Sequence, residues 1–225
     1  MYNEPMENKT EEKYDANKSG NKSSGTDSFK DVDNLQDVKD NIEYTKSKLD
    51  ELKDKQVFNP VTKPWQLRQN KILNLKIEKS LIYKYRGKIL GEPTKIVNII
   101  GDGNCLYRSL SYWITGTEDH HLKIRNSIAE VVKSNENIEK YVGGKNKLLQ
   151  YLEKNIENDG VWGTDVEIFA AAFLLKTSIY VYSTVTNKWQ IFNKYMDLKK
   201  KVMTNEKCIY LRNINNVHYD VVMDV

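Results

Sequence analysis

The sequence predicts an α+β fold in which helices come first along the chain and strands follow. Apolar residues recur at helical spacing between about residues 65 and 175. Residues 178–225 instead contain short β-branched and aromatic runs separated by polar turns. The 225 residues suffice for one sizeable domain and an appendage, and they contain no internal repeat. Helices followed by strands are typical of an α+β arrangement around one core.

Residues 1–56 are predicted to form a charged N-terminal arm. Residues 1–27 are rich in Asn, Lys, Glu, Ser and Gly, so we expect this segment to be disordered. Residues 28–56 carry an apolar stripe at helical spacing, which indicates an amphipathic helix: Leu35, Val38, Ile42, Leu49 and Leu52. A short coiled coil is the alternative, which Thr45 in the apolar seam weakens.

Residues 57–225 are predicted to form the folded domain. A helical pattern spans residues 65–85, with an expected core of Leu67, Ile72, Leu75, Leu81 and Ile82. Residues 95–100 indicate a strand that leads into a glycine-rich turn. An apolar helix over residues 105–114 follows, and Gly116 ends it.

Three more helices are predicted before the main run of strands. Thr117 is expected to cap a helix that runs to about Lys133, with an inner stripe of Ile124, Ile128, Val131 and Val132. The helical pattern of residues 138–153 breaks at Gly143-Gly144. Thr164 and Glu167 have the spacing of a capping box, which opens a buried helix through Leu175. Strands are expected at residues 178–183, 188–192, 208–212 and 218–225, with Asn187 in the first turn.

Composition favours an intracellular protein. Met1 is followed by a polar stretch, and the longest apolar run, residues 168–175, is far shorter than the about 20 residues that span a bilayer. Two cysteines make no disulfide framework, so a reducing, cytoplasmic location is expected unless other machinery exports the protein as an effector.

The net charge of +4 hides an asymmetry between the two ends of the chain. Residues 1–60 carry 10 Lys and 14 Asp or Glu, a balance of −4, and the remainder carries 25 Lys or Arg and 17 Asp or Glu, a balance of +8. These basic residues are scattered apart from Lys199-Lys200-Lys201, which favours a solvated face over a nucleic-acid-binding surface. Nucleic acid is therefore not expected as a partner, and binding with a steep salt dependence would be its signature.

Cys105 is the candidate nucleophile because it follows the turn Gly101-Asp102-Gly103-Asn104 at a predicted helix start. The N–H groups of a helix N-terminus favour the thiolate, so this position is expected to lower the pKa of Cys105. Gly103 and Asn104 belong to a loop whose backbone N–H groups, with that of Cys105, form a candidate oxyanion hole.

His218 is the candidate general base. If residues 218–225 form a strand, His218 and Asp220 point to the same side, and the carboxylate can fix the imidazole tautomer. Asp102 is the competing carboxylate, three residues before the nucleophile. The spacing leaves open whether Asp102 orients the histidine or braces the loop.

No metal or cofactor is expected. Zinc needs several clustered ligands, whereas Cys105 and Cys208 are far apart and Cys208 resembles a core residue. His120 and His121 lie at a charged helix start and are predicted to be solvated. The sequence has no phosphate loop and no dinucleotide-binding fingerprint.

Three blocks of the sequence resemble the ovarian-tumour (OTU) family of cysteine deubiquitinases. They are Asp102-Gly103-Asn104-Cys105-Leu106-Tyr107-Arg108, the block from Trp162 to Glu167, and His218-Tyr219-Asp220, in the order found in the family. The resemblance covers about residues 94–225, and residues 57–93 are a helical lead-in. Tyr107 stands where phenylalanine is common in the family.

The resemblance implies a papain-like fold, with a small twisted sheet between helical layers. It implies cleavage of the isopeptide or peptide bond after the C-terminal Gly-Gly of ubiquitin or of polyubiquitin chains. By position, Cys105 would be the nucleophile and His218 the base, with Asp220 orienting that base. Asp102 would belong to the oxyanion loop and is often counted with the catalytic set.

Two alternatives share this fold. In the first, the protein is a protease whose preferred substrate is another ubiquitin-like modifier. In the second, it is a catalytically silent ubiquitin-binding module. The presence of Cys105, His218 and both aspartates disfavours the silent module. Linkage preference and the role of residues 1–56 stay open at the level of sequence.

Overall fold

The computed structural model describes residues 39–40, 42–43, 55–81, 87–196 and 206–225. The disorder predicted for residues 1–27 falls outside these ranges, as do Ile82 and most of the helix predicted over residues 28–56. Residues 39–40 and 42–43 are helical. Among the described helices, none combines the length and apolar character needed to cross a membrane.

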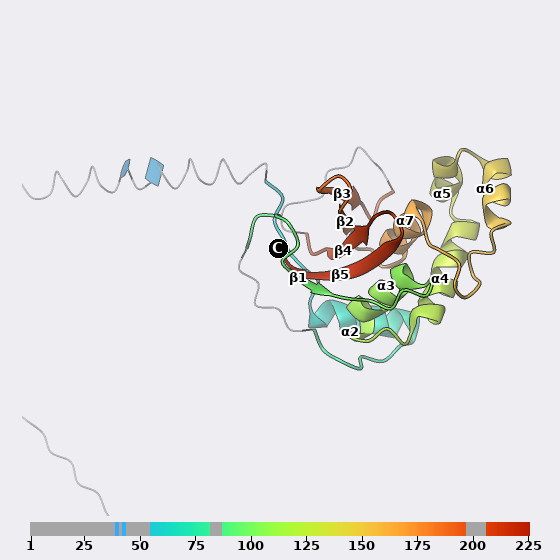
Figure 1. Cartoon of the computed structure of the whole chain (residues 1–225), viewed down its shortest axis with the longest axis horizontal. Coiled ribbons are helices and arrows are strands. Elements are labelled where there is room, and N and C mark those ends of the chain that lie inside the picture. Colours follow the sequence, from blue (N-terminus) through green and yellow to red (C-terminus); the bar gives the residue numbers. More distant parts are fainter. Residues whose placement is uncertain (1–38, 41, 44–54, 82–86, 197–205) are drawn as a thin grey trace, which may run out of the picture. The chain divides into compact units, whose positions relative to one another are not determined.

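The described strands form one mixed sheet of five strands, in the order β1-β5-β4-β2-β3 (Figure 1). Their bounds are β1 (Lys95–Val97), β2 (Ile179–Ser183), β3 (Lys188–Phe192), β4 (Ile209–Ile214) and β5 (His218–Asp224). β2 and β4 are parallel, and the other neighbours are antiparallel. Asn187 adopts a left-handed conformation in the turn from β2 to β3, with φ 53°. All the predicted strands are present, and the α+β class is confirmed.

The helices that lie between β1 and β2 in the chain pack on the sheet and on one another. They are α3 (Cys105–Thr115), α4 (His121–Ser134), α5 (Glu136–Val142), α6 (Lys145–Leu152) and α7 (Asp165–Leu174). Helix α3 packs against β5, and α4 packs against α3 and α7. Figure 1 shows α5 and α6 at the end of the folded body that is remote from β1. The packing of α3 on β5 is the contact that brings the two candidate catalytic segments together.

Two local signals in the sequence are confirmed. The Thr164 hydroxyl accepts a hydrogen bond from the Val166 N–H, and the Glu167 carboxylate accepts one from the Thr164 N–H, at 3.2 and 2.6 Å. These bonds complete the predicted capping box of α7. Gly143 has φ 98° and separates α5 from α6.

The first helix of the domain, α2 (Lys63–Leu73), is shorter than predicted and buries a different face. Leu67 and Ile72, expected in the core, are exposed. The buried face instead carries amide side chains, which bind the terminal carbonyls of other helices. Gln66 donates to Trp113 O at 3.2 Å, Asn70 to Ile114 O at 2.6 Å, and Gln69 to Leu175 O at 3.0 Å. The spacing of apolar residues cannot reveal these amides on the buried face. They stabilise the packing by donating to carbonyls that helix ends leave without intrahelical partners.

The capping role predicted for Thr117 is wrong, because α4 begins four residues later, at His121. The Thr117 carbonyl instead accepts hydrogen bonds from the Ser111 and Thr115 hydroxyls, at 2.8 and 3.1 Å. Nor are the two adjacent histidines simply solvated. Both are half-buried, and Nδ1 of His121 lies 2.9 Å from the Glu118 carbonyl oxygen.

Candidate active site

Cys105 is the first residue of α3, and only 8% of its surface is exposed. Burial raises the pKa of the Cys105 thiol, while the backbone of Tyr219, of Leu106 and of Cys105 itself acts in the opposite direction. The net direction is opposite to that predicted from the helix start alone, because desolvation outweighs the backbone N–H groups. A thiolate at this position therefore needs a neighbouring group that takes the proton.

His218 and Asp220 lie on the same side of β5, as their spacing predicts. Nε2 of His218 is 3.0 Å from Oδ1 of Asp220. The other edge of the ring faces the Cys105 loop, because Nδ1 lies 3.5 Å from the point where a Cβ on Gly101 would stand. Asp220 accepts at Nε2, so the neutral ring carries its proton there and leaves Nδ1 as the basic nitrogen.

Three contacts bring the cysteine and histidine segments to one place. The Cys105 thiol lies beside the backbone of Tyr219, which directly follows His218. One turn further along α3, the Ser109 hydroxyl donates to the Tyr219 carbonyl at 3.2 Å. Gly101, four residues before the cysteine, lies against the His218 ring. The segments that carry the predicted nucleophile and base thus meet at the contact between α3 and β5.

Asp102 braces the loop, and its carboxylate is bound by Arg108. Arg108 binds both of its carboxylate oxygens, with Nε 3.1 Å from Oδ1 and Nη2 2.6 Å from Oδ2. Oδ1 of Asp102 also accepts from the Asn104 N–H at 3.0 Å. The Arg108 hydrogen bonds hold the pKa of Asp102 well below its usual range. Of the two carboxylates that the sequence left open, Asp220 is the one that binds His218.

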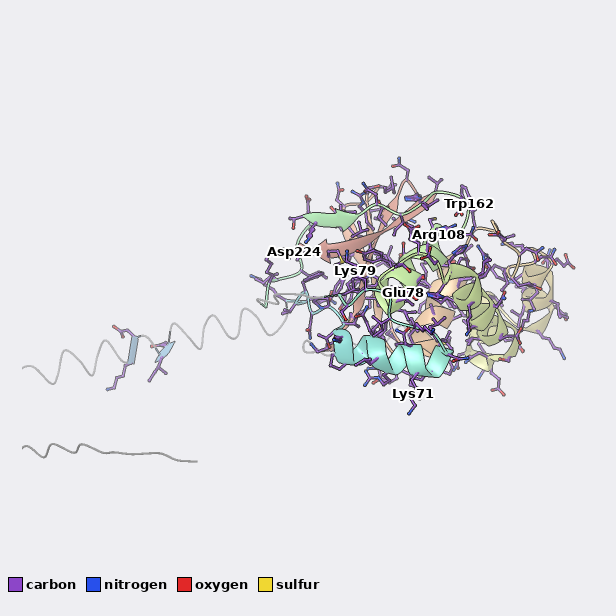
Figure 2. The ribbon with its side chains drawn as sticks, turned by 90° about the horizontal axis from the view of Figure 1, so that it is seen from below. Lys71, Glu78, Lys79, Arg108, Trp162 and Asp224 are labelled. Atoms are coloured by element: carbon purple, nitrogen blue, oxygen red, sulfur yellow. The ribbon has the colours of Figure 1, made fainter. Side chains whose placement is uncertain are left out.

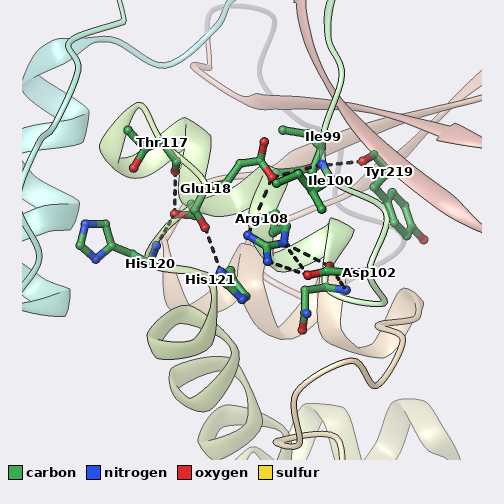
Figure 3. A network of polar contacts seen from close by, with 12 residues as sticks. Ile99, Ile100, Asp102, Arg108, Thr117, Glu118, His120, His121 and Tyr219 are labelled. Carbon is green, nitrogen blue, oxygen red and sulfur yellow. Dashed lines mark hydrogen bonds and ion pairs between the residues drawn. The ribbon is translucent and has the colours of Figure 1, made fainter.

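Arg108 and Glu118 extend this bracing to the chain before the loop (Figure 3). Nη1 of Arg108 lies 3.9 Å from Oε2 of Glu118, which accepts from the Ile100 N–H at 3.1 Å. The neighbouring Ile99 N–H donates to Oδ1 of Asp220 at 2.9 Å. The segment that enters the cysteine loop is therefore fixed both by α3 and by the carboxylate that binds the histidine.

The two predicted oxyanion-loop residues pack tightly against the loop that precedes α7. Gly103 has φ 86°, and a Cβ there would stand 2.1 Å from the Gly160 carbonyl oxygen. The Asn104 side chain donates to Asp159 at 2.8 Å and accepts from the Gly160 N–H at 3.0 Å. Because the Asn104 N–H is bound to Asp102, it is occupied, and of the three predicted oxyanion donors those of Gly103 and Cys105 stay candidates.

Arg125 is a site-supporting residue that the sequence interpretation missed. It lies on α4, is fully buried, and donates to Oδ1 of Asn104 at 2.6 Å and to Ile156 O at 2.9 Å. Its guanidinium lies 3.8 Å from the centre of the Tyr107 ring, a cation–π contact. The signal was present, because Arg125 stands three residues before Ile128 on the apolar stripe of its helix.

An exposed aromatic side chain projects near the start of α3. A Cβ on Gly163 would stand 2.5 Å from Leu106, so the loop after Gly160 lies directly on the first turn of this helix. Trp162, within that loop, is 59% exposed. Figure 2 shows the labelled Trp162 and Arg108 in the upper part of the folded body, with Lys71 of α2 at its lower edge.

The matching protein family carries the description "OTU-like cysteine protease", and its match covers residues 100–219. The chain is 28% identical over 140 residues to OVARIAN TUMOR DOMAIN-containing deubiquitinating enzyme 7 of Arabidopsis thaliana, covering 62% of this chain and 35% of that protein. It is 33% identical over 108 residues to Ubiquitin thioesterase otu2 of Schizosaccharomyces pombe, covering 43% of this chain and 35% of that protein. The chain thus spans about a third of the length of these relatives. The solved OTUD1 OTU domain is similar with a TM-score of 0.47 and 23% identity, covering 57% of this chain and 85% of that one.

Proposed function

Because the chain belongs to the family of OTU-like cysteine proteases, we propose that it is a deubiquitinase that uses Cys105 as its nucleophile. Its substrate is ubiquitin joined through its C-terminal Gly-Gly to an amine, in a conjugate or in a polyubiquitin chain. The names of the two curated relatives support ubiquitin as the partner. The observation that carries the proposal is the His218–Asp220 pair, whose free imidazole edge lies at the Cys105 loop.

The reaction proceeds by covalent catalysis. Nδ1 of His218 takes the thiol proton, and the Cys105 sulfur attacks the carbonyl carbon of the last glycine of ubiquitin. The resulting oxyanion is held by the amides of Gly103 and Cys105, at roughly 3 kcal/mol for each well-placed donor. The imidazolium then protonates the leaving amine. His218 next takes a proton from a water molecule, whose oxygen attacks the thioester carbonyl carbon. The carbon–sulfur bond breaks, the ubiquitin carboxylate leaves, and the imidazolium returns the proton to the Cys105 sulfur.

Asp220 and Asp102 have separate roles in this scheme. Asp220 orients the imidazole by accepting from Nε2, and it stabilises the imidazolium as it forms. Asp102 positions the oxyanion loop by accepting from the Asn104 N–H. Its bidentate pair with Arg108 fixes the carboxylate, which supports a positioning role for Asp102 rather than proton transfer.

The two cysteines allow a direct test. Ubiquitin with an electrophile at its C-terminus is expected to label the wild type and Cys208→Ala, but not Cys105→Ala. Cys208 is the matched control, because it is also buried but lies beside β4, outside the site. Release of a fluorogenic amine from the ubiquitin C-terminus reports turnover.

Each of the alternatives predicts a different result. A silent binding module would retain ubiquitin without ever reacting with the probe. A protease for another ubiquitin-like modifier would react with that modifier's probe in preference to the ubiquitin probe. Labelling of Cys105→Ala at the wild-type rate would contradict the assignment of the nucleophile.

A further inference from the structure

We propose that Arg212 is a positioning residue for catalysis, which acts through Asp220 to keep the His218 imidazole in the tautomer that can accept the Cys105 proton. The inference rests on the proposed function, in which His218 is the base. Arg212 lies on β4, outside the three sequence blocks that resemble the family. Its effect on the thiol can nevertheless be measured without ubiquitin.

The pairing of β4 with β5 sets Arg212 directly opposite Asp220. Nη2 of Arg212 lies 2.6 Å from Oδ2 of Asp220. The other oxygen, Oδ1, accepts from the Ile99 N–H at 2.9 Å and faces Nε2 of His218 at 3.0 Å. Both carboxylate oxygens are therefore occupied, and the guanidinium fixes which of them faces the imidazole.

Asp220 needs a cation because it is only 2% exposed. Burying a charged carboxylate to this degree costs free energy unless a positive charge lies beside it. Arg212 is the permanently charged group bound to Asp220, since His218 carries charge only when it is protonated. The Arg212 guanidinium thus maintains Asp220 as an acceptor in both protonation states of the histidine.

The orientation of Asp220 determines the tautomer of His218. An ionised Asp220 accepts only, so Nε2 must donate and Nδ1 keeps its lone pair. A carboxylate that turns away from Nε2 no longer holds the ring proton there, so the tautomer with the proton on Nδ1 becomes populated. An Nδ1–H group cannot take the proton of the thiol. Loss of Arg212 therefore slows the first step of the reaction without removing any group that touches substrate.

Arg212→Met removes the charge and retains much of the side-chain volume. We expect kcat to fall about 10²-fold, within the range that general acid–base catalysis contributes. KM should change by no more than about twofold, because no substrate contact is lost. Alkylation of Cys105 by iodoacetamide at pH 7 should slow in parallel. Arg212→Lys should recover part of both rates, since an ammonium group supplies the charge but not the planar fork.

Lys88→Met is the matched control. Lys88 binds Asp224 at 2.7 Å, so this variant also removes a cation from an aspartate of β5, at the end remote from His218. It should leave kcat and alkylation unchanged. A purely structural role for Arg212 would instead lower the urea midpoint and leave both rates of the folded protein intact. If Arg212→Met does not fold, Arg212→Lys and Arg212→Gln take its place in the same measurements.

A double-mutant cycle tests whether Arg212 acts through Asp220. In an Asp220→Ala background, Arg212→Met should change kcat and alkylation by less than about twofold, because the tautomer is no longer controlled. Retention of wild-type kcat and alkylation by Arg212→Met, or an equal effect in both backgrounds, would overturn the proposal. If the wild type does not process ubiquitin, the proposed function fails, whereas slower alkylation of Arg212→Met would still support this inference.

Discussion

Replacement of Gly103 by alanine tests how tightly the cysteine loop is held. The new Cβ would stand 2.1 Å from the Gly160 carbonyl oxygen and 2.7 Å from its carbonyl carbon, so one of the two loops has to move. Gly103 also has φ 86°, a conformation that costs a residue with a Cβ roughly 1–2 kcal/mol. Overpacking adds about 1–3 kcal/mol. Together the two effects predict a loss of about 2–5 kcal/mol in the free energy of unfolding.

Gly160→Ala is the matched control, because Gly160 is the other half of the same contact. Its φ of 81° is close to that of Gly103, but a Cβ there would approach nothing nearer than the Asp102 carbonyl oxygen, at 3.7 Å. This variant should lose only the backbone contribution, roughly 1–2 kcal/mol. The difference in the free energy of unfolding between the two variants measures the cost of the steric clash between the loops.

Urea denaturation and turnover of a fluorogenic ubiquitin amide measure the two consequences separately. Gly103→Ala should also lower kcat by on the order of 10²-fold, because a displacement of about 1 Å is enough to misplace a catalytic group. Gly160→Ala should retain most of its kcat. Equal stability losses in the two variants would refute the reasoning, since they would show that the Gly103 loop relaxes freely.

Two further predictions concern carboxylates that support the site. The Arg108 contact lowers the pKa of Asp102, so its stabilising contribution is present above about pH 4 and is lost as the pH falls towards the folded-state value. The urea midpoints of wild type and Asp102→Asn should therefore converge on acidification from pH 6 to pH 3, and a constant gap would contradict this. Glu167→Ala should cost about 2–4 kcal/mol in urea denaturation, because the cap of α7 and a buried acceptor for Tyr151 are both lost. Asn135→Ala, which removes only the cap of α5, should cost about 1 kcal/mol, and equal losses would argue against a buried role for Glu167.

Local signals predicted the elements of the fold well. The Thr164–Glu167 spacing specifies a capping box because each partner is set by the helical turn itself. Glycines at 116 and 143 end helices because both require positive φ. By contrast, the buried face of α2 depends on carbonyls of α3 and α7, more than 40 residues away in sequence. No periodicity within α2 contains that information.

The residues of the candidate site also differ in whether a local sequence pattern predicts them. Cys105, His218 and Asp220 were predictable because a turn, a helix start and the alternation of a strand each place one side chain. Two arginines that support the site were not predicted: Arg125, which binds Asn104, and Arg212, which the pairing of β4 with β5 sets opposite Asp220. The Arg125 contact depends on the tertiary fold, whereas the Arg212 contact depends on the register of a hairpin that the apolar pattern alone does not fix. The direction of the Cys105 pKa likewise follows from burial, which the sequence pattern does not measure.

The amides of α2 set a lower limit on the size of an active fragment. The family match begins at residue 100, yet Gln66, Gln69 and Asn70 close the C-terminal ends of α3 and α7 from outside that interval. A polypeptide trimmed to residues 100–219 would lack α2, so those carbonyls would lose their hydrogen-bond donors. It would also lose β1, which borders the strand that carries His218. Expression work that follows the boundaries of the match would thus begin from a core that lacks these partners, and α2 and β1 belong within the smallest folded unit.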